Sequence, residues 1–265
     1  MGASAARSLL GERCNIHDFA DCQNIQSGSV FIIASGGSAK DFPFQTFHDI
    51  PMITMNGAIS MFLDTPVRPF FYACTDRDFS NQQPQLFAEA LHRSDRVALW
   101  EEHVRSLSIR TDGELYLLHK APKPSFIDIL RRKDQELVRN HTFPGWGQKL
   151  LGFSKNLQRG FFDARTVAYL ALQIAYHVGF TKVFLVGVDL NQDLGRFYER
   201  NDMAVSPCGL DQHYESRILP SFQLVANSVV DDTFAVYNLS EFSRLPHSVI
   251  PYKTLEEVTA MVREG

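Results

Sequence analysis

The segment SVFIIASGGS, residues 29–38, combines a strand pattern with a glycine turn. Its continuous apolar run contains β-branched residues and stops at two glycines, which is typical of a parallel strand buried on both faces. Glycines directly after such a strand let backbone N–H groups approach an anion, because no Cβ is in the way. The segment therefore predicts a central strand followed by an anion-binding turn. A tight turn that binds nothing is the alternative.

Three further apolar runs have the same form, and each ends at a polar residue where a loop should begin. They are PMITMN (51–56), RPFFYACTD (68–76) and TKVFLVGVDL (181–190). Residues 81–93 and 164–180 have helical length and composition, and the second segment is so apolar that it should pack on the sheet. Strands that alternate with helices predict an α/β fold with a single doubly wound, mostly parallel, Rossmann-like sheet.

The length of 265 residues and the 45% hydrophobic content favour a single domain, 1–265. Within it, residues 1–27 form a predicted N-terminal extension, and residues 114–160 form a predicted basic, aromatic insertion. Nine Lys and Arg side chains stand against three Asp and Glu between residues 119 and 159. Such a mixture suits an anionic, partly apolar surface. An ordinary solvated helix and loop is the alternative.

Cysteine usage and hydropathy indicate the compartment. The four cysteines follow no C-x-x-C spacing, which fits a reduced, cytoplasmic protein. Residues 1–25 carry five charged side chains and so lack the apolar core of a signal peptide, and no later run reaches membrane-spanning length. We expect a soluble or peripheral protein without a nucleic-acid partner.

Residues that end the predicted strands are the site candidates, because ligands of doubly wound sheets bind outside the carboxyl ends of the strands. They are Gly36, Gly37, Ser38, Asn56, Thr75, Asp76, Gly187 and Asp189. The glycine turn matches neither a Walker A loop nor a full G-x-G-x-x-G, so the sequence lacks the motifs that would best support an ATP or dinucleotide ligand. Asp76-x-Asp78 resembles a metal-binding Asp-x-Asp. We favour a cap by Asp78 and hydrogen bonds from a sugar or ribose to Asp76, and expect no metal or cofactor.

Several pieces occur in an order that resembles the bacterial lipopolysaccharide inner-core transferases of Kdo (3-deoxy-D-manno-octulosonic acid). The pieces are FIIASGGS, MNGAI, FFYACTDRDF, GFSKNLQRGFFDARTVAYLALQIAYHVGFTKVFLVGVDL, RFYERND, ILPSF and VYNLSEFSRLPHSVIPY, spanning residues 28–252. FIIASGG, MNGA and LALQIAYHVGFTKVFLVGVDL are more distantly similar to the bacterial sialyltransferases that use CMP-N-acetylneuraminate. The resemblance implies a glycosyltransferase that uses CMP-Kdo, with a Kdo-bearing lipid A or core acceptor at the inner membrane.

The resemblance also implies roles for the residues that end the first three strands. Gly36 and Gly37 would lie against the nucleotide, and Asn56 would hydrogen-bond the CMP moiety. Thr75 and Asp76 would face the donor sugar.

The later pieces supply the rest of the donor site. Thr166 and the helix N-terminus would bind the Kdo carboxylate or the phosphate, with charge from Arg165. Gly187 and Asp189 would receive the ribose or cytosine. In GRFYER, Tyr198 would donate to the departing phosphate, helped by Arg196.

The general base implied by comparison with the sialyltransferases is His213, in LDQHYESRILPSF. Asp211, Asp76 and Asp189 are the alternatives. The reaction would be inverting and independent of metal.

The acceptor would dock on Lys149, Lys155 and Arg159 of the basic segment. Gly36 stands where the sialyltransferases place an Asn, and Asn191 where they place a Tyr, so cytidine recognition is expected to differ. The competing functions are another nucleotide-dependent transferase, pyrophosphokinase-like or sialyltransferase-like, and a non-catalytic nucleotide- or lipopolysaccharide-binding protein.

Overall fold

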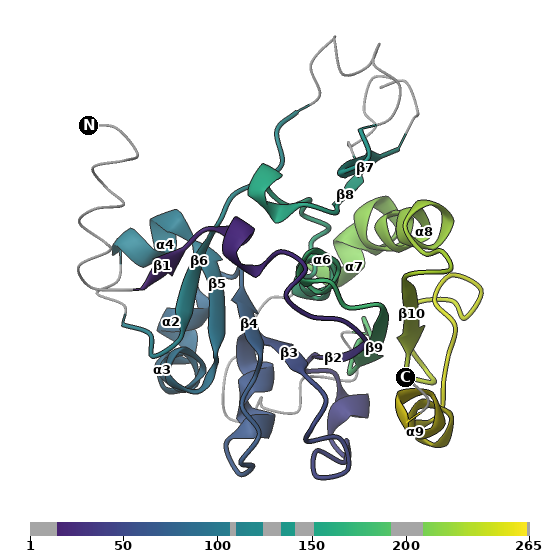
Figure 1. Ribbon diagram of the computed structural model, residues 1–265, viewed down its shortest axis with the longest axis horizontal. Coiled ribbons are helices and arrows are strands. Elements are labelled where there is room, and N and C mark those ends of the chain that lie inside the picture. The colour runs from purple at the N-terminus through teal and green to yellow at the C-terminus, as the bar shows by residue number, and fades with distance from the viewer. Residues whose placement is uncertain (1–14, 107–109, 124–133, 141–150, 192–208, 264–265) are drawn as a thin grey trace.

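The computed structural model describes residues 15–106, 110–123, 134–140, 151–191 and 209–263. Its centre is an eight-stranded sheet in the order β1-β6-β5-β4-β3-β2-β9-β10, and every neighbouring pair is parallel (Figure 1). The strands are β1 (Ile16–His17), β2 (Ser29–Ile33), β3 (Met52–Met55), β4 (Phe71–Cys74), β5 (Arg96–Trp100), β6 (Glu114–Leu118), β9 (Lys182–Val186) and β10 (Ala235–Asn238). The predicted doubly wound parallel sheet is confirmed.

The four predicted strands are β2, β3, β4 and β9, which are consecutive in the sheet in the order β4-β3-β2-β9. Their residues are almost all fully buried, because apolar clusters cover both faces. Strands β5, β6 and β10 were not among the predicted strands. β10 alternates between half-buried and buried positions, as expected for a strand near a sheet edge.

Helices cover the two faces of the sheet. On one face lie α6 (Val167–Val178) and α8 (Leu219–Ser228), and on the other lie α3 (Pro84–Arg93) and α9 (Leu255–Arg263). The predicted helix at 164–180 is α6, which contributes ten buried residues to the core. It ends at Gly179 (φ +106), three residues before β9 begins, so α6 runs antiparallel to the strands. Its N-terminus therefore faces the carboxyl edge of the sheet.

Strands β7 (Leu137–Arg139) and β8 (Gly152–Ser154) form a separate antiparallel pair that projects from the sheet (Figure 1). The predicted insertion begins earlier, at residue 114, but β6 within it is a strand of the main sheet. Likewise β1 of the predicted extension 1–27 pairs with β6. Pairing to distant strands thus attaches parts of both segments to the main sheet.

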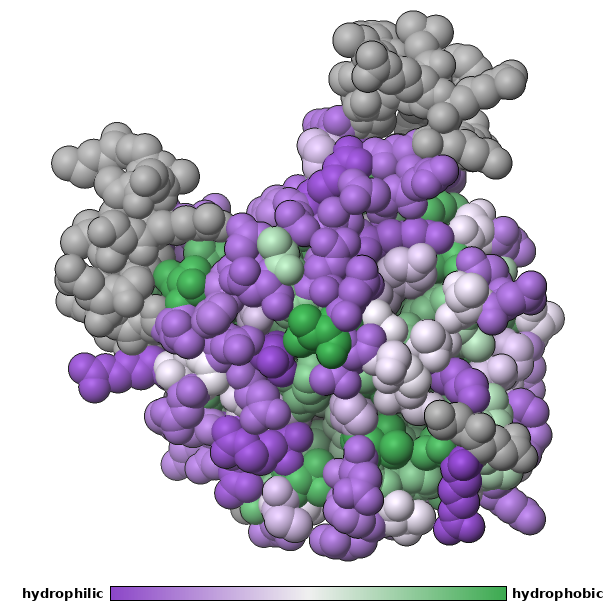
Figure 2. Space-filling view, viewed as in Figure 1, coloured by the Kyte–Doolittle hydropathy of each residue, from purple (hydrophilic) through white to green (hydrophobic). Residues whose placement is uncertain are grey.

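The surface is mostly hydrophilic on the face shown in Figure 2, where hydrophobic residues form separate small patches. Among the described residues, no helix combines the length and the apolar character that a bilayer crossing needs. Cys22 and Cys74 are buried free thiols, and burial raises the pKa of each to about 12. Cys14 and Cys208 lie outside the described residues.

Candidate functional site

The carboxyl edge of the sheet has a topological switch point between β2 and β9. From β2 the chain proceeds to β3 on one side, whereas β9 leads to β10 on the other. Such points are where ligands of doubly wound sheets bind. The glycine turn that follows β2, with the short helix η2 (Gly37–Ala39), and the segment 187–189 that follows β9 flank this point. Two of the predicted site segments are thus adjacent in space.

Asp189 holds the glycine turn in place. Its side chain is buried, and Oδ2 accepts a hydrogen bond from the Ser38 N–H at 3.0 Å. Oδ1 accepts a second one from the Ser38 hydroxyl, which also lies 2.7 Å from Ser240 Oγ, just after β10. A Cβ on Gly36 would meet Asp189 Oδ2 at 2.5 Å and the Gly187 carbonyl oxygen at 2.4 Å. Segments following the neighbouring strands β2, β9 and β10 are therefore joined through Ser38.

The turn offers an anion fewer N–H groups than the sequence predicts. The Gly36 N–H donates to the Gly187 carbonyl at 3.0 Å, and the Ser38 N–H donates to Asp189. Gly37 is exposed, and no described residue accepts a hydrogen bond from its N–H. Among the described residues, Gly37 is therefore the member of this turn whose N–H has no acceptor, while the N–H groups of Gly36 and Ser38 are used internally.

Asn56 follows β3 in a strained conformation. Its φ of +41° lies in the left-handed region, which non-glycine residues adopt rarely and often at functional sites. Its side-chain Oδ1 is buried and has no hydrogen-bond partner among the described residues. An unsatisfied acceptor at the carboxyl edge is suited to a donor group of a ligand.

The Asp76 loop follows β4. Trp100 Nε1 donates to the Thr75 carbonyl at 2.9 Å, and Asp76 Oδ1 accepts from the Asp78 N–H at 3.0 Å. Asp78 precedes the short helix α2 (Phe79–Gln82), but its carboxylate makes no capping hydrogen bond, so the predicted cap is wrong. Among the described residues, no three His, Cys, Asp or Glu side chains are grouped as metal ligands.

The N-terminus of α6 lies at the same edge. Thr166 is its N-cap residue, as predicted, but the hydroxyl makes no capping bond and the first turn has no acidic residue. The helix end is therefore open to an anion. Arg165 precedes it with a φ of +66°, and its N–H donates to Asp163 Oδ1 at 2.9 Å. Partial burial would raise the pKa of Asp163, but hydrogen bonds from Arg165 and Lys120 bring it below its ordinary value.

His213 ends the short helix α7 (Leu210–His213), which continues into the π-helical turn η5 (Tyr214–Ile218). Asp211 pairs with Arg244, whose backbone N–H donates to the Asp189 carbonyl at 2.9 Å. Arg217 donates to the Asp163 carbonyl at 2.8 Å and 3.0 Å. These contacts tie the His213 region both to the strand end at Asp189 and to the segment before α6.

The predicted acceptor residues are less available than expected. Arg159 Nη1 pairs with Asp134 at 2.7 Å and with Glu136 at 3.1 Å, and Lys155 Nζ lies 5.0 Å from the centre of the Tyr176 ring. Lys149, Arg196 and Tyr198 lie outside the described residues. Arg159 is therefore a partner of two carboxylates within the protein, and Lys155 lies over an aromatic ring.

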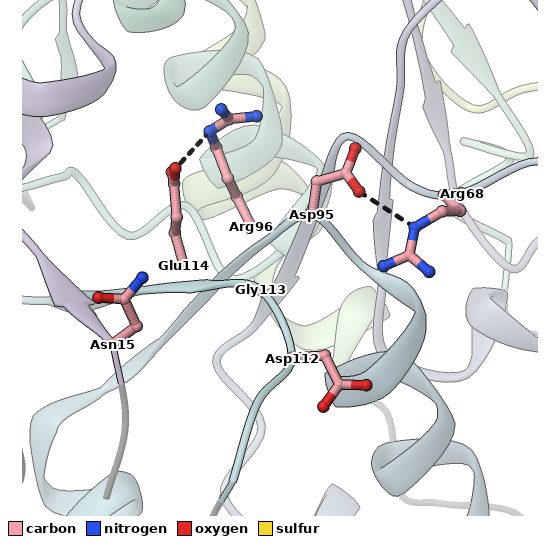
Figure 3. A pocket seen from close by; sticks show the side chains of 7 residues that line it. All are labelled: Asn15, Arg68, Asp95, Arg96, Asp112, Gly113 and Glu114. Atoms are coloured by element: carbon pink, nitrogen blue, oxygen red, sulfur yellow. Dashed lines mark hydrogen bonds and ion pairs between the residues drawn. The ribbon is translucent and has the colours of Figure 1, made fainter. Parts of the chain in front are cut away.

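One cavity, of about 330 Å³, lies at the opposite, amino edge of the sheet (Figure 3). Its lining residues include the ion pairs Arg68–Asp95 (3.2 Å) and Arg96–Glu114 (3.0 Å). Since these side chains neutralise one another, the cavity is a structural feature of the loops there and contains none of the predicted site residues.

Three residues that contact this edge of the sheet were not predicted as site residues. They are Trp100, Lys120 and Ser240, which contact Thr75, Asp163 and Ser38, respectively. Trp100 ends the apolar run RVALW, which could have been read as a strand. The Ser240 contact depends on pairing between distant segments, so no local signal reveals it.

Comparison with known proteins identifies the family of the chain. Residues 18–256 match the family described as 3-deoxy-D-manno-octulosonic acid transferase WaaZ. The chain belongs to this family. It is 29% identical over 252 residues to the probable 3-deoxy-manno-octulosonic acid transferase of Escherichia coli K12, covering 90% of this chain and 87% of that protein. The equivalent Salmonella typhimurium protein is 26% identical over 242 residues, covering 86% and 87%.

Solved structures give weaker matches. The sialyltransferase CstII from Campylobacter jejuni, in complex with cytidine-5'-monophosphate, is 13% identical with a TM-score of 0.48, covering 84% of each chain. The MAf glycosyltransferase from Magnetospirillum magneticum AMB-1 is also 13% identical with a TM-score of 0.48, covering 91% of this chain and 37% of that one. The family assignment rests on the sequence match.

Proposed function

We propose that this chain transfers Kdo from CMP-Kdo to a Kdo-bearing acceptor of the lipopolysaccharide inner core. The observation that carries the proposal is the family match over residues 18–256, which includes every strand end of the switch point. The open anion-binding groups at that edge support it, since the donor is a phosphodiester of a carboxylated sugar. No cofactor takes part.

In the proposed donor site, Gly37 and the N-terminus of α6 bind the two anionic groups of CMP-Kdo, the phosphate and the Kdo carboxylate. Both offer N–H groups that are not used within the described protein. Asn56 accepts a hydrogen bond from the cytidine through its unsatisfied Oδ1. Thr75 and Asp76 lie beside the sugar, and Gly187 lines the nucleotide end.

Transfer requires that the anomeric carbon leave the phosphate as the acceptor hydroxyl attacks from the opposite face, which inverts the configuration. Negative charge then develops on the departing CMP. Arg165, the α6 terminus, Arg196 and Tyr198 stabilise this charge in the proposed mechanism, and loss of one such donor typically costs about 100- to 1000-fold in rate. These groups make the step independent of metal.

A base takes the proton of the acceptor hydroxyl, and we assign this role to His213. It is half-buried near the carboxyl edge, and the contacts of Asp211 and Arg217 hold its helix there. Asp76 is the alternative base. As a base, Asp189 would have to lose hydrogen bonds from Ser38, so we assign it to holding the turn instead.

The test is transfer from CMP-Kdo, generated in situ, to Kdo-lipid A or a truncated core, followed by mass spectrometry. Wild type should add one Kdo with or without EDTA. His213→Ala should lower the rate by about 100- to 10,000-fold, as expected for loss of a general base. His48→Ala, which changes an exposed histidine outside the site, is the matched control and should transfer normally.

Other outcomes assign other functions. If His213→Ala keeps full activity, Asp76 is assigned as the base instead. Binding of CMP without transfer to any acceptor indicates a nucleotide-binding protein, while turnover of CMP-N-acetylneuraminate or ATP instead of CMP-Kdo indicates another transferase. For localisation, we propose a cytoplasmic protein in peripheral contact with the inner membrane, tested by co-sedimentation with vesicles that contain Kdo-lipid A.

A further inference from the structure

Trp100 stands at the carboxyl end of β5 with one side packed against the core. Its indole ring lies 5.2 Å from the buried Phe161 ring, centre to centre, and the residue is only half-buried. The indole N–H is fixed by the Thr75 carbonyl at 2.9 Å. The ring orientation is therefore set by the loop that we place beside the donor sugar.

Two cations flank this ring from the two neighbouring strands. The Arg77 guanidinium, after β4, lies 5.8 Å from the centre of the ring, and the Lys120 ammonium, after β6, lies 5.7 Å from it. Both distances are within the range of cation–π attraction. Because β5 lies between β4 and β6 in the sheet, the order of the strands alone brings a cation to Trp100 from either side.

The two cations remain accessible to a ligand. Their side chains are both 59% exposed, and among the described residues Arg77 pairs with Glu102 and Lys120 with Asp163. Exposed ion pairs of this kind are weak, so a ligand carboxylate can share these cations. Asp163 also accepts the Arg165 N–H, which joins this surface to the N-terminus of α6.

We infer that Trp100, Arg77 and Lys120 form the subsite for the anionic sugar of the acceptor. The sugar carboxylate would bind the Arg77 and Lys120 cations, and an apolar C–H face of the sugar would pack against the exposed part of the indole ring. This inference rests on the proposed function and replaces the acceptor residues Lys155 and Arg159 predicted from sequence. The subsite adjoins the Asp76 loop, so an acceptor hydroxyl bound there lies beside the donor sugar.

Steady-state kinetics with Kdo-lipid A as acceptor tests the subsite. Arg77→Gln and Lys120→Gln should each raise the acceptor KM by about 10-fold, as expected for loss of a charge-assisted contact. The KM for CMP-Kdo, and the slow hydrolysis of CMP-Kdo without acceptor, should stay unchanged. The matched control for Arg77→Gln is Arg68→Gln, at an arginine of the amino edge whose side chain is 55% exposed. The matched control for Lys120→Gln is Lys123→Gln, at an exposed lysine.

The ring is tested by two substitutions that differ in aromaticity. Trp100→Phe keeps an aromatic surface and should retain most of the affinity for the acceptor. Trp100→Leu removes that surface and should lose most of this affinity. Thermal unfolding shows whether each variant is folded. A rise in the donor KM, an effect of Arg68→Gln as large as that of Arg77→Gln, or acceptor KM values equal to wild type in all three subsite positions would overturn the inference.

A binding measurement separates this inference from the proposed function. In a Trp146→Phe background, which leaves Trp100 as the one tryptophan of the sequence, free Kdo should quench the fluorescence more strongly than uncharged mannose. Such quenching without any Kdo transfer would support the subsite and refute the proposed function. Equal quenching by the two sugars would refute the subsite even if transfer occurs.

Discussion

Asp189→Asn should loosen the glycine turn while leaving the sheet intact. In the native protein, the carboxylate accepts hydrogen bonds from both the N–H and the hydroxyl of Ser38. Asparagine keeps one acceptor oxygen for the Ser38 N–H, and its amide can donate to the Ser38 hydroxyl, which turns towards Ser240. Hydrogen bonds to charged groups are worth about 1.5–3 kcal/mol each and neutral ones about 0.5–1.5 kcal/mol, so making both bonds neutral should lower the free energy of unfolding by about 2–3 kcal/mol.

A double-mutant cycle isolates the contact. Ser38→Ala removes the hydroxyl donor but keeps the backbone bond to Asp189. Because the two changes remove a shared interaction, the double variant should be less destabilised than the sum of the single ones, with a coupling of about 0.5–3 kcal/mol. Ser243→Ala is the control, because it removes a 2.7 Å hydrogen bond to the neighbouring Val188 carbonyl and leaves the Asp189 carboxylate unchanged. Its effect on the free energy of unfolding should simply add to that of Asp189→Asn.

The assays are urea unfolding and calorimetric binding of CMP. Since the turn positions the Gly37 N–H, Asp189→Asn should weaken CMP binding as well as stability. If Asp189→Asn and Ser38→Ala add within about 0.5 kcal/mol, the two residues do not act together and the reasoning fails. If Asp189→Asn keeps both stability and CMP affinity but loses transfer, Asp189 is the catalytic base.

Two further predictions concern close packing and pH. Gly36→Ala should lower the free energy of unfolding by about 1–3 kcal/mol and weaken CMP binding, because its Cβ would press on the Gly187 carbonyl oxygen and the Asp189 carboxylate. Gly209→Ala, whose Cβ would have no atom nearer than 3.6 Å, should change stability little. Equal effects of the two substitutions would contradict the packing. Burial lowers the pKa of His177 in the folded protein. Below a pH of about 6.5, His177 therefore binds a proton in the unfolded chain but not in the folded one. The free energy of unfolding should then fall by up to about 1.4 kcal/mol for each pH unit of acidification. Urea unfolding at pH 7.5, 6.5 and 5.5 should show a flatter dependence for His177→Gln, and an unchanged slope would exclude this histidine as the cause.

Sequence reasoning worked best where the signal was local. The buried strands β2, β3, β4 and β9 were identified because a strand covered on both faces must be apolar throughout. It failed for β5, β6 and β10, although β5 lies nearer the centre of the sheet than β9 does. The cap expected from Asp78 also failed, since its carboxylate makes no capping bond.

By itself, the sequence determined the class of fold, the central strands and the loops that follow them, because side-chain periodicity and glycine placement act over a few residues. The tertiary structure decided what those loops do. Asp189 meets Ser38 across 151 positions of sequence, and Ser38 meets Ser240 across 202. Likewise, Trp100 acquires its two cations from the strands on either side. Such contacts follow from the order of strands in the sheet, which long-range hydrogen bonding and packing set and no short segment encodes.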